Sequence, residues 1–398
     1  MARLEFVDLT FEDKKDRIQI NFLRLFYFEL GKEELKRIGD FEIEKNSIEF
    51  RDVSEQKAQK KFSQLLDAGF RILRNKLTKK QTVYIHQYSG IPLIGHGAFG
   101  IVDRGSSLIE VKPITSCNIN CIYCSVDQDI RPVDFIIEKD YLVKEIKKLI
   151  EFKKTNIEIH FGSQGEVLLY GPIINLVKDL SRIPEINKIS LETNGTLLNE
   201  ELIDCLAEAG LSQFNLSINA LDPGLASKIA GCAYDIEHVK KMARHISGKT
   251  GLIIAPVWIP GINDDEMPKL IEFSKELDCR IGIQNFLNYK FGRNPVKQMD
   301  FELFRKKLKE LESRYKIKLL LTAEDFNIRE TRQLPKPFRK GEIVKTKIVL
   351  PGRLKNEKLA AERERIISIP SCCADIGQKV TVKITRTKHN IFIAEHLT

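Results

Sequence analysis

Apolar and polar positions alternate in a regular rhythm through the middle of the chain, from about residue 107 to residue 290. Short apolar runs typical of β-strands are separated by longer stretches with the helical period, such as 138–154 and 199–210. Repeated βα units predict a parallel sheet with right-handed crossovers. Six such units are too few for a closed eight-stranded barrel, so we expect an open, partial barrel with its site at the carboxyl ends of the strands. The predicted strands are 107–114, 156–161, 188–193, 213–219, 251–258 and 280–286.

The segments around this core have different patterns. Residues 11–75 are predicted to be mostly helical, because residues 55–77 carry an apolar stripe at the helical period. The glycine-rich stretch 88–107 predicts tight turns beside the site. It does not predict a phosphate-binding P-loop, because no Lys-Ser/Thr pair follows its glycines. After the core we expect a helix at 300–314 and a strand at 317–321.

The last part of the chain is predicted to be all-β. Four short alternating runs follow a proline-containing linker and predict a five-stranded oligonucleotide-binding (OB) barrel. The predicted fold class is therefore α/β, a partial (β/α)6 TIM-like barrel with a helical N-terminal region and a small C-terminal β-barrel. The expected domains are 1–106 (helical region and glycine-rich loop), 107–325 (core), 326–340 (linker) and 341–398 (basic β-barrel).

The positive charge of the chain is concentrated at its C-terminal end. The 398 residues carry a formal net charge of +9. Residues 332–398 hold 15 Lys/Arg and 6 Asp/Glu, so this segment accounts for the whole excess and the rest is neutral. This distribution indicates a polyanion-binding module attached to a neutral body, with a basic solubilising surface as the alternative. No signal peptide or membrane-spanning run is evident, so we expect a cytoplasmic protein without a membrane partner.

Three cysteines lie close together after the first predicted core strand, in "VKPITSCNINCIYCSVDQD" (residues 111–129). Cys117, Cys121 and Cys124 have the spacing CxxxCxxC, and no fourth cysteine lies in the loop. Three thiolates can bind three irons of a cubane iron–sulfur cluster and leave the fourth iron open for chemistry. Zinc is the alternative, but its usual second pair of ligands is missing nearby. The other five cysteines form no recognisable second-cluster pattern.

The CxxxCxxC motif, with an aromatic residue before its last cysteine (Tyr123), resembles that of the radical S-adenosylmethionine (radical SAM) superfamily. The resemblance covers about residues 107–290 and implies a [4Fe-4S] cluster and S-adenosylmethionine as cofactors. "FGSQGEVLLY" resembles the family's glycine–glycine–glutamate element, with Gln164 in place of a glycine, followed by Gly165 and Glu166. By the same resemblance, the remaining cofactor contacts are expected from Asn194 in "LETNGTLL", Ser217 and Asn219 in "NLSINALD", and Gln284 in "IQNFLNYKFGR".

The basic C-terminal segment resembles the TRAM domain, a small RNA-binding barrel, in "GEIVKTKIVLPGR" and "ADIGQKVTVKITRTKHNIFIAEHL". TRAM domains accompany radical enzymes in the methylthiotransferases. This chain departs from those enzymes because its first 116 residues contain no cysteine for a second cluster. The N-terminal part and glycine loop resemble instead an archaeal group of predicted iron–sulfur oxidoreductases.

Together these features predict an enzyme that reductively cleaves S-adenosylmethionine at a [4Fe-4S] cluster to modify a substrate. RNA, either tRNA or rRNA, is the expected partner and a base the expected target, with a ferredoxin or flavodoxin as the expected electron donor. Two alternatives remain open. One is a radical SAM enzyme that acts on a protein or a small metabolite, and the other is a non-catalytic iron–sulfur protein that binds RNA.

Overall fold

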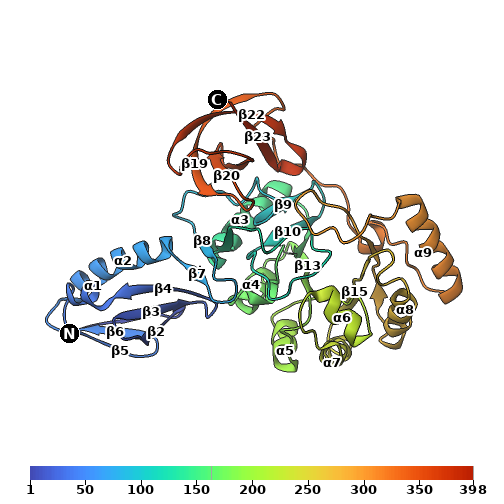
Figure 1. Cartoon of the computed structure of the whole chain (residues 1–398), viewed down its shortest axis with the longest axis horizontal. Coiled ribbons are helices and arrows are strands. Elements are labelled where there is room, and N and C mark those ends of the chain that lie inside the picture. Colours follow the sequence, from blue (N-terminus) through green and yellow to red (C-terminus); the bar gives the residue numbers. More distant parts are fainter. Residues whose placement is uncertain (163, 398) are drawn as a thin grey trace.

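A seven-stranded sheet forms the centre of the molecule (Figure 1). The computed structural model describes residues 1–162 and 164–397. The strand order is β17-β15-β14-β13-β12-β10-β9, in which β9 (Gly100–Asp103) is antiparallel to β10 and the other neighbours are parallel. The parallel strands confirm the predicted partial (β/α)6 barrel. They are β10 (Leu108–Lys112), β12 (Ile157–Phe161), β13 (Ile186–Thr193), β14 (Gln213–Leu216), β15 (Gly251–Ile254) and β17 (Arg280–Ile281).

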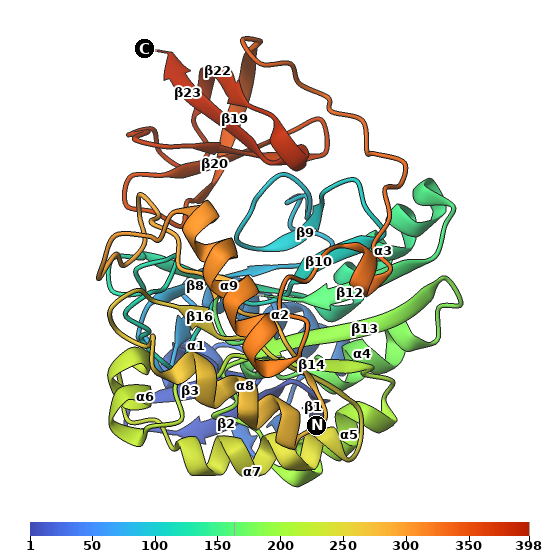
Figure 2. The same ribbon diagram turned by 90° about the vertical axis from the view of Figure 1, so that its right-hand side faces the viewer.

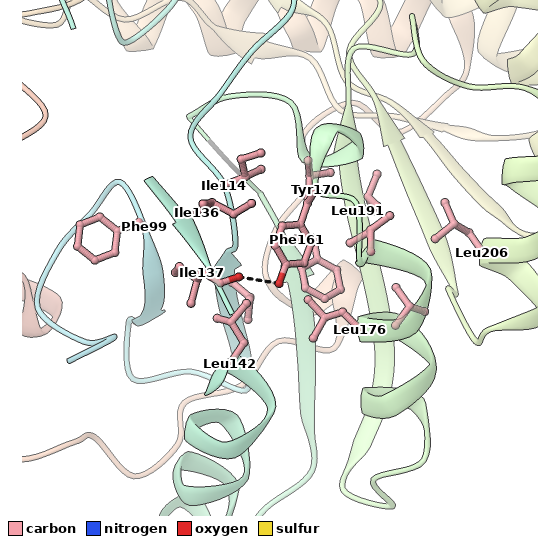
Figure 3. Packing of buried hydrophobic residues seen from close by; sticks show 14 of the residues in the cluster. Phe99, Ile114, Ile136, Ile137, Leu142, Phe161, Tyr170, Leu176, Leu191 and Leu206 are labelled. Carbon is pink, nitrogen blue, oxygen red and sulfur yellow. Dashed lines mark hydrogen bonds between the residues drawn. The ribbon is translucent and has the colours of Figure 1, made fainter. Parts of the chain in front are cut away.

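Helices cover the outer face of this sheet, so buried apolar residues alternate along the strands with residues that face the concave side. On β12, Ile157, Ile159 and Phe161 are buried, whereas Glu158 and His160 point to the opposite, concave face. Figure 3 shows the buried Tyr170 packed near Ile137 of β11 (Val133–Ile137), Phe161 of β12 and Leu176 of α4. The hydroxyl of Tyr170 donates to the carbonyl of Ile137 at 2.7 Å. The helices are α3 (Lys139–Lys153), α4 (Ile173–Ser181), α5 (Glu200–Glu208), α6 (Pro223–Ala230), α7 (Ile236–Ser247) and α8 (Glu266–Glu276).

The prediction of a mostly helical N-terminal region was wrong. Residues 55–77 do contain a helix, α2 (Glu55–Arg71), but strands dominate around it and α1 (Lys32–Lys36) is one short helix. The strands are β1 (Ala2–Glu5), β2 (Leu9–Asp13), β3 (Arg17–Phe22), β4 (Phe26–Gly31), β5 (Phe41–Ile43), β6 (Ser47–Phe50), β7 (Arg74–Asn75) and β8 (Gln81–Ile85). They form a three-stranded sheet, β1-β6-β5, and most of a six-stranded sheet, β11-β8-β7-β4-β3-β2, on the left in Figure 1.

An unusual turn explains why this sheet is hard to recognise. The strands β3 and β4 pair as a hairpin, with Phe22 opposite Phe26. Leu23 and Arg24 in the turn both have positive φ, 48° and 64°. Such turns normally contain Gly, Asn or Asp. Hydrophobic residues therefore continue from β3 into β4, and no turn-forming residue in the sequence indicates that the chain reverses direction there.

The chain leaves the core sheet directly after the cysteine segment. Strand β10 belongs to the core sheet, but the next strand, β11 (Val133–Ile137), pairs in parallel with β8 of the N-terminal sheet. The sequence pattern did not predict β11. The cysteine loop is consequently fixed at its two ends by two different sheets.

The C-terminal residues form the predicted five-stranded barrel, which lies at the top of Figures 1 and 2. It is closed in the order β19-β20-β21-β23-β22, and β21 and β23 are parallel. The unpredicted strand β20 lacks alternation, because Leu359 and Ala360 are both fully buried. The strands are β19 (Ile343–Pro351), β20 (Lys358–Glu362), β21 (Arg365–Ile369), β22 (Lys379–Arg386) and β23 (Phe392–Leu397).

Two further predictions concern the end of the core. The helix expected at 300–314 is confirmed as α9 (Phe301–Tyr315). The strand expected at 317–321 is absent from this described part of the chain. The backbone N–H groups of Leu319 and Leu320 donate instead to the carboxylate of Glu312, at 2.7 and 2.8 Å. The expected strands at 251–258 and 280–286 each divide in two, and their second halves, β16 (Val257–Trp258) and β18 (Gln284–Asn285), pair with each other.

The glycine-rich loop forms turns, as predicted, and the β-barrel docks on it. The N–H of Ile366 donates to the carbonyl of Ile94 at 2.9 Å, and the N–H of Phe392 donates to the carbonyl of Gly95 at 3.0 Å. Gly95 has φ +127°, and a Cβ atom there would lie 2.3 Å from the backbone of Ile366. Only glycine allows this close approach.

The segment between α9 and the barrel is also fixed to the core. The buried ammonium of Lys153 forms an ion pair with Asp103 at 3.0 Å and donates to the hydroxyl of Thr331 at 2.6 Å and the carbonyl of Arg332 at 3.2 Å. No helix within the described ranges has both the length and the apolar character needed to cross a bilayer.

Candidate active site

The cysteine loop lies at the carboxyl end of β10 and is held along its length. The backbone N–H groups of Asn120 and Ile122 donate to the last residues of α6, at 2.9 and 3.0 Å. The N–H of Arg293 donates to the carbonyl of Cys124 at 2.8 Å, and its guanidinium donates to the carbonyl of Asn120 at 2.7 Å. The loop is therefore fixed in place by side chains and backbone from distant parts of the core.

The three cysteines are partly buried free thiols. Burial raises the pKa of Cys117 to about 12. Burial also raises the pKa of Cys121, and the neighbouring Cys117 and Cys124 thiols raise it further, so the three sulfur atoms lie within electrostatic reach of one another. In the described ranges, no three His, Cys, Asp or Glu side chains form a group that could hold a single metal ion. A cubane cluster does not require such a group, because each thiolate binds a different iron.

A buried polar network from the N-terminal sheet fixes the residue before Cys117. The side chain of Asn75 donates to the hydroxyl of Ser116 at 2.8 Å and to the carboxylate of Asp134 at 2.9 Å. Asp134 also accepts from Thr78 at 3.0 Å and forms an ion pair with Arg131. Because Asn75, Ser116, Arg131 and Asp134 are almost completely buried, removing one of them would leave its partners unsatisfied.

The predicted glycine–glutamate element lies against the same residue. The N–H of Glu166 donates to the carbonyl of Ser116 at 2.7 Å. A Cβ atom on Gly165 would lie 2.2 Å from that carbonyl oxygen, so the close approach requires glycine. Within the described residues the side-chain Oε1 of Gln164 is buried without a hydrogen-bond partner, and the backbone carbonyl of Gln164 accepts from the side chain of Gln128 at 3.1 Å. The structure thus brings Gln164, Gly165 and Glu166 to the cysteine loop; Ser163 lies outside the described residues.

Glu166 is buried and accepts hydrogen bonds from the end of β13. Its carboxylate accepts from the hydroxyl of Thr193 and the N–H of Asn194, both at 2.8 Å, and from the N–H of Leu168 at 3.0 Å. Burial raises the pKa of Glu166 to about 7, and these three donors oppose the increase. An ammonium group that bound there would favour the ionised carboxylate.

Asn194 and Asn219 connect two more strand ends to the cysteine loop. The amide of Asn194 donates to the side chain of Asn118, the residue after Cys117, at 3.0 Å. The amide of Asn219 donates to the hydroxyl of Tyr123 at 2.9 Å. The N–H of Ser217 donates to the carbonyl of Thr193 at 2.9 Å. These predicted residues therefore occupy neighbouring strand ends around the loop.

Gln284 lies apart from these contacts. It is exposed and lines a cavity of about 490 Å³ on the concave face of the sheet, which α9 and residues 319–328 also line. Its N–H donates to the carbonyl of Pro256 at 2.8 Å.

The sequence analysis missed the charged residues of this concave face. Lys112 and Glu110 form an ion pair at 3.2 Å on β10. His160 contacts the hydroxyl of Ser190 at 2.9 Å, and burial lowers the pKa of His160 to about 4. Burial raises the pKa of Glu192, and Lys112 opposes this. The signal was available, since these residues alternate with buried apolar ones on their strands.

Comparison with known proteins identifies the family. The model of the radical SAM superfamily matches residues 111–274. The uncharacterized protein MJ0103 of Methanocaldococcus jannaschii is 40% identical over 362 residues, which are 81% of this chain and 82% of that protein. The chain belongs to the radical SAM superfamily. Its fold and its expected family membership are thereby confirmed, and the protein is an enzyme.

More distant radical SAM relatives match only in part. The GTP 3',8-cyclase of Listeria welshimeri is 29% identical over 190 residues, so the match spans 47% of this chain and 55% of the cyclase. Among solved structures, Streptococcus suis SuiB bound to S-adenosylmethionine aligns with a TM-score of 0.44 and 14% identity, over 79% of this chain and 71% of SuiB.

Radical SAM enzymes use a [4Fe-4S] cluster and S-adenosylmethionine, and they need a reductant and a substrate. The residues of this chain fit an anionic cluster. The buried guanidinium of Arg131 donates to the carbonyl of Thr115, two residues before Cys117, and its Nε has no hydrogen-bond partner among the described residues. Buried thiols with raised pKa values would need the charge of the irons to lose their protons. The chemistry of the donor set therefore suits the cofactors of the family.

Proposed function

We propose that this radical SAM enzyme modifies a base in RNA, with Cys117, Cys121 and Cys124 as the ligands of the cluster. When bound, the cluster and S-adenosylmethionine supply one-electron chemistry that begins with reductive cleavage of a carbon–sulfur bond. In this proposal Glu166 accepts a hydrogen bond from the cofactor's ammonium, and Tyr123, Gln164, Gly165, Asn194, Ser217, Asn219 and Gln284 complete its surroundings. A substrate bound in the cavity of about 490 Å³ between the concave face and α9 would itself exclude water from the reaction.

One observation carries the RNA proposal, a row of lysines on the outer face of the β-barrel. Lys345 and Lys347 on β19 lie beside Lys379 and Lys383 on β22, and Lys347 is directly opposite Lys379. All four are exposed, and none forms a salt bridge within residues 1–162 and 164–397. Like charges opposite one another destabilise a sheet. A polyphosphate backbone would relieve this repulsion and release counterions.

Charge removal on this face tests the proposal. Replacing Lys345, Lys347, Lys379 and Lys383 by Gln should weaken binding of cellular tRNA, measured by fluorescence anisotropy. The slope of log K against log salt should become shallower by about 3, at about 0.7 per lost contact on single strands. The matched control replaces four exposed lysines on two helices remote from the barrel, Lys57, Lys60, Lys306 and Lys309, and should keep the original slope.

The target would be identified separately. Mass spectrometry of total RNA nucleosides from a deletion strain should show the loss of one modified nucleoside, which should return with the wild-type gene and not with a Cys117→Ala variant. An unchanged nucleoside profile, together with equal RNA affinity in the lysine variant and its control, would contradict the RNA proposal.

A second candidate is a free purine nucleotide. It is favoured by the partial similarity to GTP 3',8-cyclases and by the cavity of about 490 Å³, a size typical of small-molecule sites. Methionine release from S-adenosylmethionine by the reduced protein distinguishes the candidates. Stimulation by GTP or ATP without RNA would favour a nucleotide, whereas stimulation by RNA alone would favour the base modification.

A further inference from the structure

Polar side chains form two rows across the concave face of the core sheet. On β10 and β12 they alternate with buried apolar residues. The upper row, at the carboxyl ends of the strands, consists of Lys112, Gly162, Glu192 and Asn215. The lower row, two residues earlier on each strand, consists of Glu110, His160, Ser190 and Gln213. The cysteine loop follows the upper row on β10, and residues 164–166 follow it on β12, so this row is the part of the concave face nearest the candidate cofactor site.

Glycine leaves a gap in the upper row. By the register of the three strands, Gly162 lies between Lys112 on β10 and Glu192 on β13. Neighbouring strands are about 4.8 Å apart, so the backbones of Lys112 and Glu192 are separated by about 10 Å. A Cβ atom on Gly162 would lie 3.2 Å from Nε2 of His160 and 3.5 Å from a carboxylate oxygen of Glu192. An imidazole nitrogen and a carboxylate oxygen therefore border the gap.

The hydrogen bonds of His160 decide the role of its Nε2. The hydroxyl of Ser190 donates to the carboxylate of Glu158 at 3.2 Å. Ser190 therefore accepts from the Nδ1–H of His160, at 2.9 Å. Burial lowers the pKa of His160 to about 4, so the ring is neutral near pH 7 and its Nε2 carries a lone pair. His160 thus presents a hydrogen-bond acceptor to the gap.

The two ends of the gap have opposite charge. Among the described residues, the carboxylate of Glu192 forms no hydrogen bond or ion pair. Lys112 forms an ion pair with Glu110 at 3.2 Å, which directs its ammonium to the concave face. An ammonium has three N–H donors, and this pair uses one of them. From β10 to β13, the gap therefore offers a donor, then an acceptor from His160, then a second acceptor.

The cavity of about 490 Å³ reaches the same two rows. His160, Ser190 and Asn215 line it on the side of the sheet. Apolar side chains of α9, including Phe304 and Leu308, line it on the other side. A planar ring with polar groups along one edge suits a space with one polar and one apolar wall.

We propose that this gap binds the Watson–Crick edge of a guanine base, with Lys112 donating to O6, His160 accepting from N1–H and Glu192 accepting from the 2-amino group. Guanine presents one acceptor followed by two donors along this edge. Adenine and cytosine place an unprotonated ring nitrogen at its centre, and uracil places a second acceptor at its end, so each would bring a lone pair against an acceptor of the protein. The inference rests on the proposed function, in which the substrate is a nucleotide base. Guanine in RNA and guanine in free GTP present the same edge.

Inosine provides the test, because its base is guanine without the 2-amino group. In calorimetry on the reconstituted protein with S-adenosylmethionine, the dissociation constant of GTP should be at least about tenfold lower than that of ITP. This is the effect typical of one hydrogen bond to a charged group. In fluorescence anisotropy, a short oligouridine with one central guanosine should bind more tightly than the same RNA with inosine, by a similar factor. Neither comparison requires a substitution in the protein.

Three variants assign the contacts. Glu192→Gln should bring the ratio of guanine to inosine affinity close to one, because the charged acceptor of the 2-amino group is lost. Lys112→Gln should weaken GTP and ITP alike, by about tenfold, and keep their ratio, because both bases carry O6. The matched control, Glu201→Gln, changes an exposed carboxylate on α5 and should leave both affinities unchanged. A purely structural effect of Glu192→Gln would weaken GTP and ITP equally.

The outcomes separate this inference from the RNA proposal. A preference for guanosine over inosine in RNA would support both. A preference for GTP over ITP without one in RNA would support the guanine site and assign it to a free nucleotide, against the RNA proposal. Equal affinity for guanine and inosine in both forms, including no binding of either, would overturn the inference, as would a wild-type ratio in Glu192→Gln. The RNA proposal would then still be decided by the lysine variant and the nucleoside profile.

Discussion

The N-terminal sheet and the C-terminal β-barrel are attached to the core by contacts of different kinds. The N-terminal sheet supplies Asn75, whose side-chain amide donates to Ser116 and Asp134 in a buried network next to Cys117. The β-barrel docks through its backbone, because the N–H groups of Ile366 and Phe392 donate to the carbonyls of Ile94 and Gly95. The first attachment depends on buried polar side chains, whereas the second depends on a close backbone approach that only glycine allows. The N-terminal sheet therefore positions the cysteine loop, whereas the barrel is mounted on the glycine-rich loop.

The largest effect is expected from breaking the N-terminal contact. Asp134→Ala removes the buried partner of Arg131, Asn75 and Thr78. Loss of one member of a buried ion pair typically costs about 3–5 kcal/mol. Urea unfolding should show this loss, whereas Glu342→Ala, which breaks the exposed ion pair with Arg363 on the barrel, should cost no more than about 1 kcal/mol. Equal losses of unfolding free energy in Asp134→Ala and Glu342→Ala would contradict this distinction between the N-terminal sheet and the β-barrel.

Ser116, which Asn75 of the N-terminal sheet contacts, also accepts a backbone hydrogen bond from Glu166. A change at Glu166 therefore tests the same region of the site. Glu166→Ala should leave the iron content unchanged but weaken S-adenosylmethionine binding about tenfold or more, because a charge-assisted hydrogen bond contributes about 1.5–3 kcal/mol. Glu166→Gln keeps the shape of the side chain and should lose less affinity. Calorimetry on both variants checks this, and unchanged affinity in Glu166→Ala would remove Glu166 from the cofactor site.

Gly95→Ala should break the docking of the β-barrel. The added Cβ would lie 2.3 Å from the backbone of Ile366, at a φ of +127° that suits only glycine. Strain of this kind costs about 1–3 kcal/mol. Limited proteolysis should then cut faster within residues 326–340. Gly97→Ala is the control, because its Cβ would meet only the side chain of Ile391 at 3.6 Å.

The smallest effect concerns His96, which lies in the glycine-rich loop under the barrel. Burial lowers the pKa of His96 to about 3 from its usual 6.5. The unfolded chain therefore takes up a proton first as the pH falls, and stability should decrease below about pH 6.5. Between pH 7.5 and 5.5 the loss is about 1.4 kcal/mol. His96→Gln should reduce this pH dependence in thermal unfolding, and an unaltered dependence would contradict the burial argument.

The core could be predicted because its signals are local. The alternation of β10, β12, β13 and β14 follows from one buried and one concave face, and the cysteine spacing lies within a single loop. The N-terminal sheet could not, because Leu23 and Arg24 occupy a turn without turn-forming residues. Nor could the gap at Gly162, since Lys112, Gly162 and Glu192 lie far apart in the sequence and share no local pattern. Only the register of the sheet brings them into one row.

The anchoring of the segment before the barrel has a consequence for any ligand that the barrel binds. Lys153 fastens Thr331 and Arg332 to the core, so the barrel is not carried on a freely moving tether. A flexible linker would present a bound ligand over a wide range of positions, at an effective concentration set by the length of the chain. A fixed mount presents it in one orientation relative to the cysteine loop. The protein would then fix how far the reacting part of the ligand lies from the part that the barrel binds.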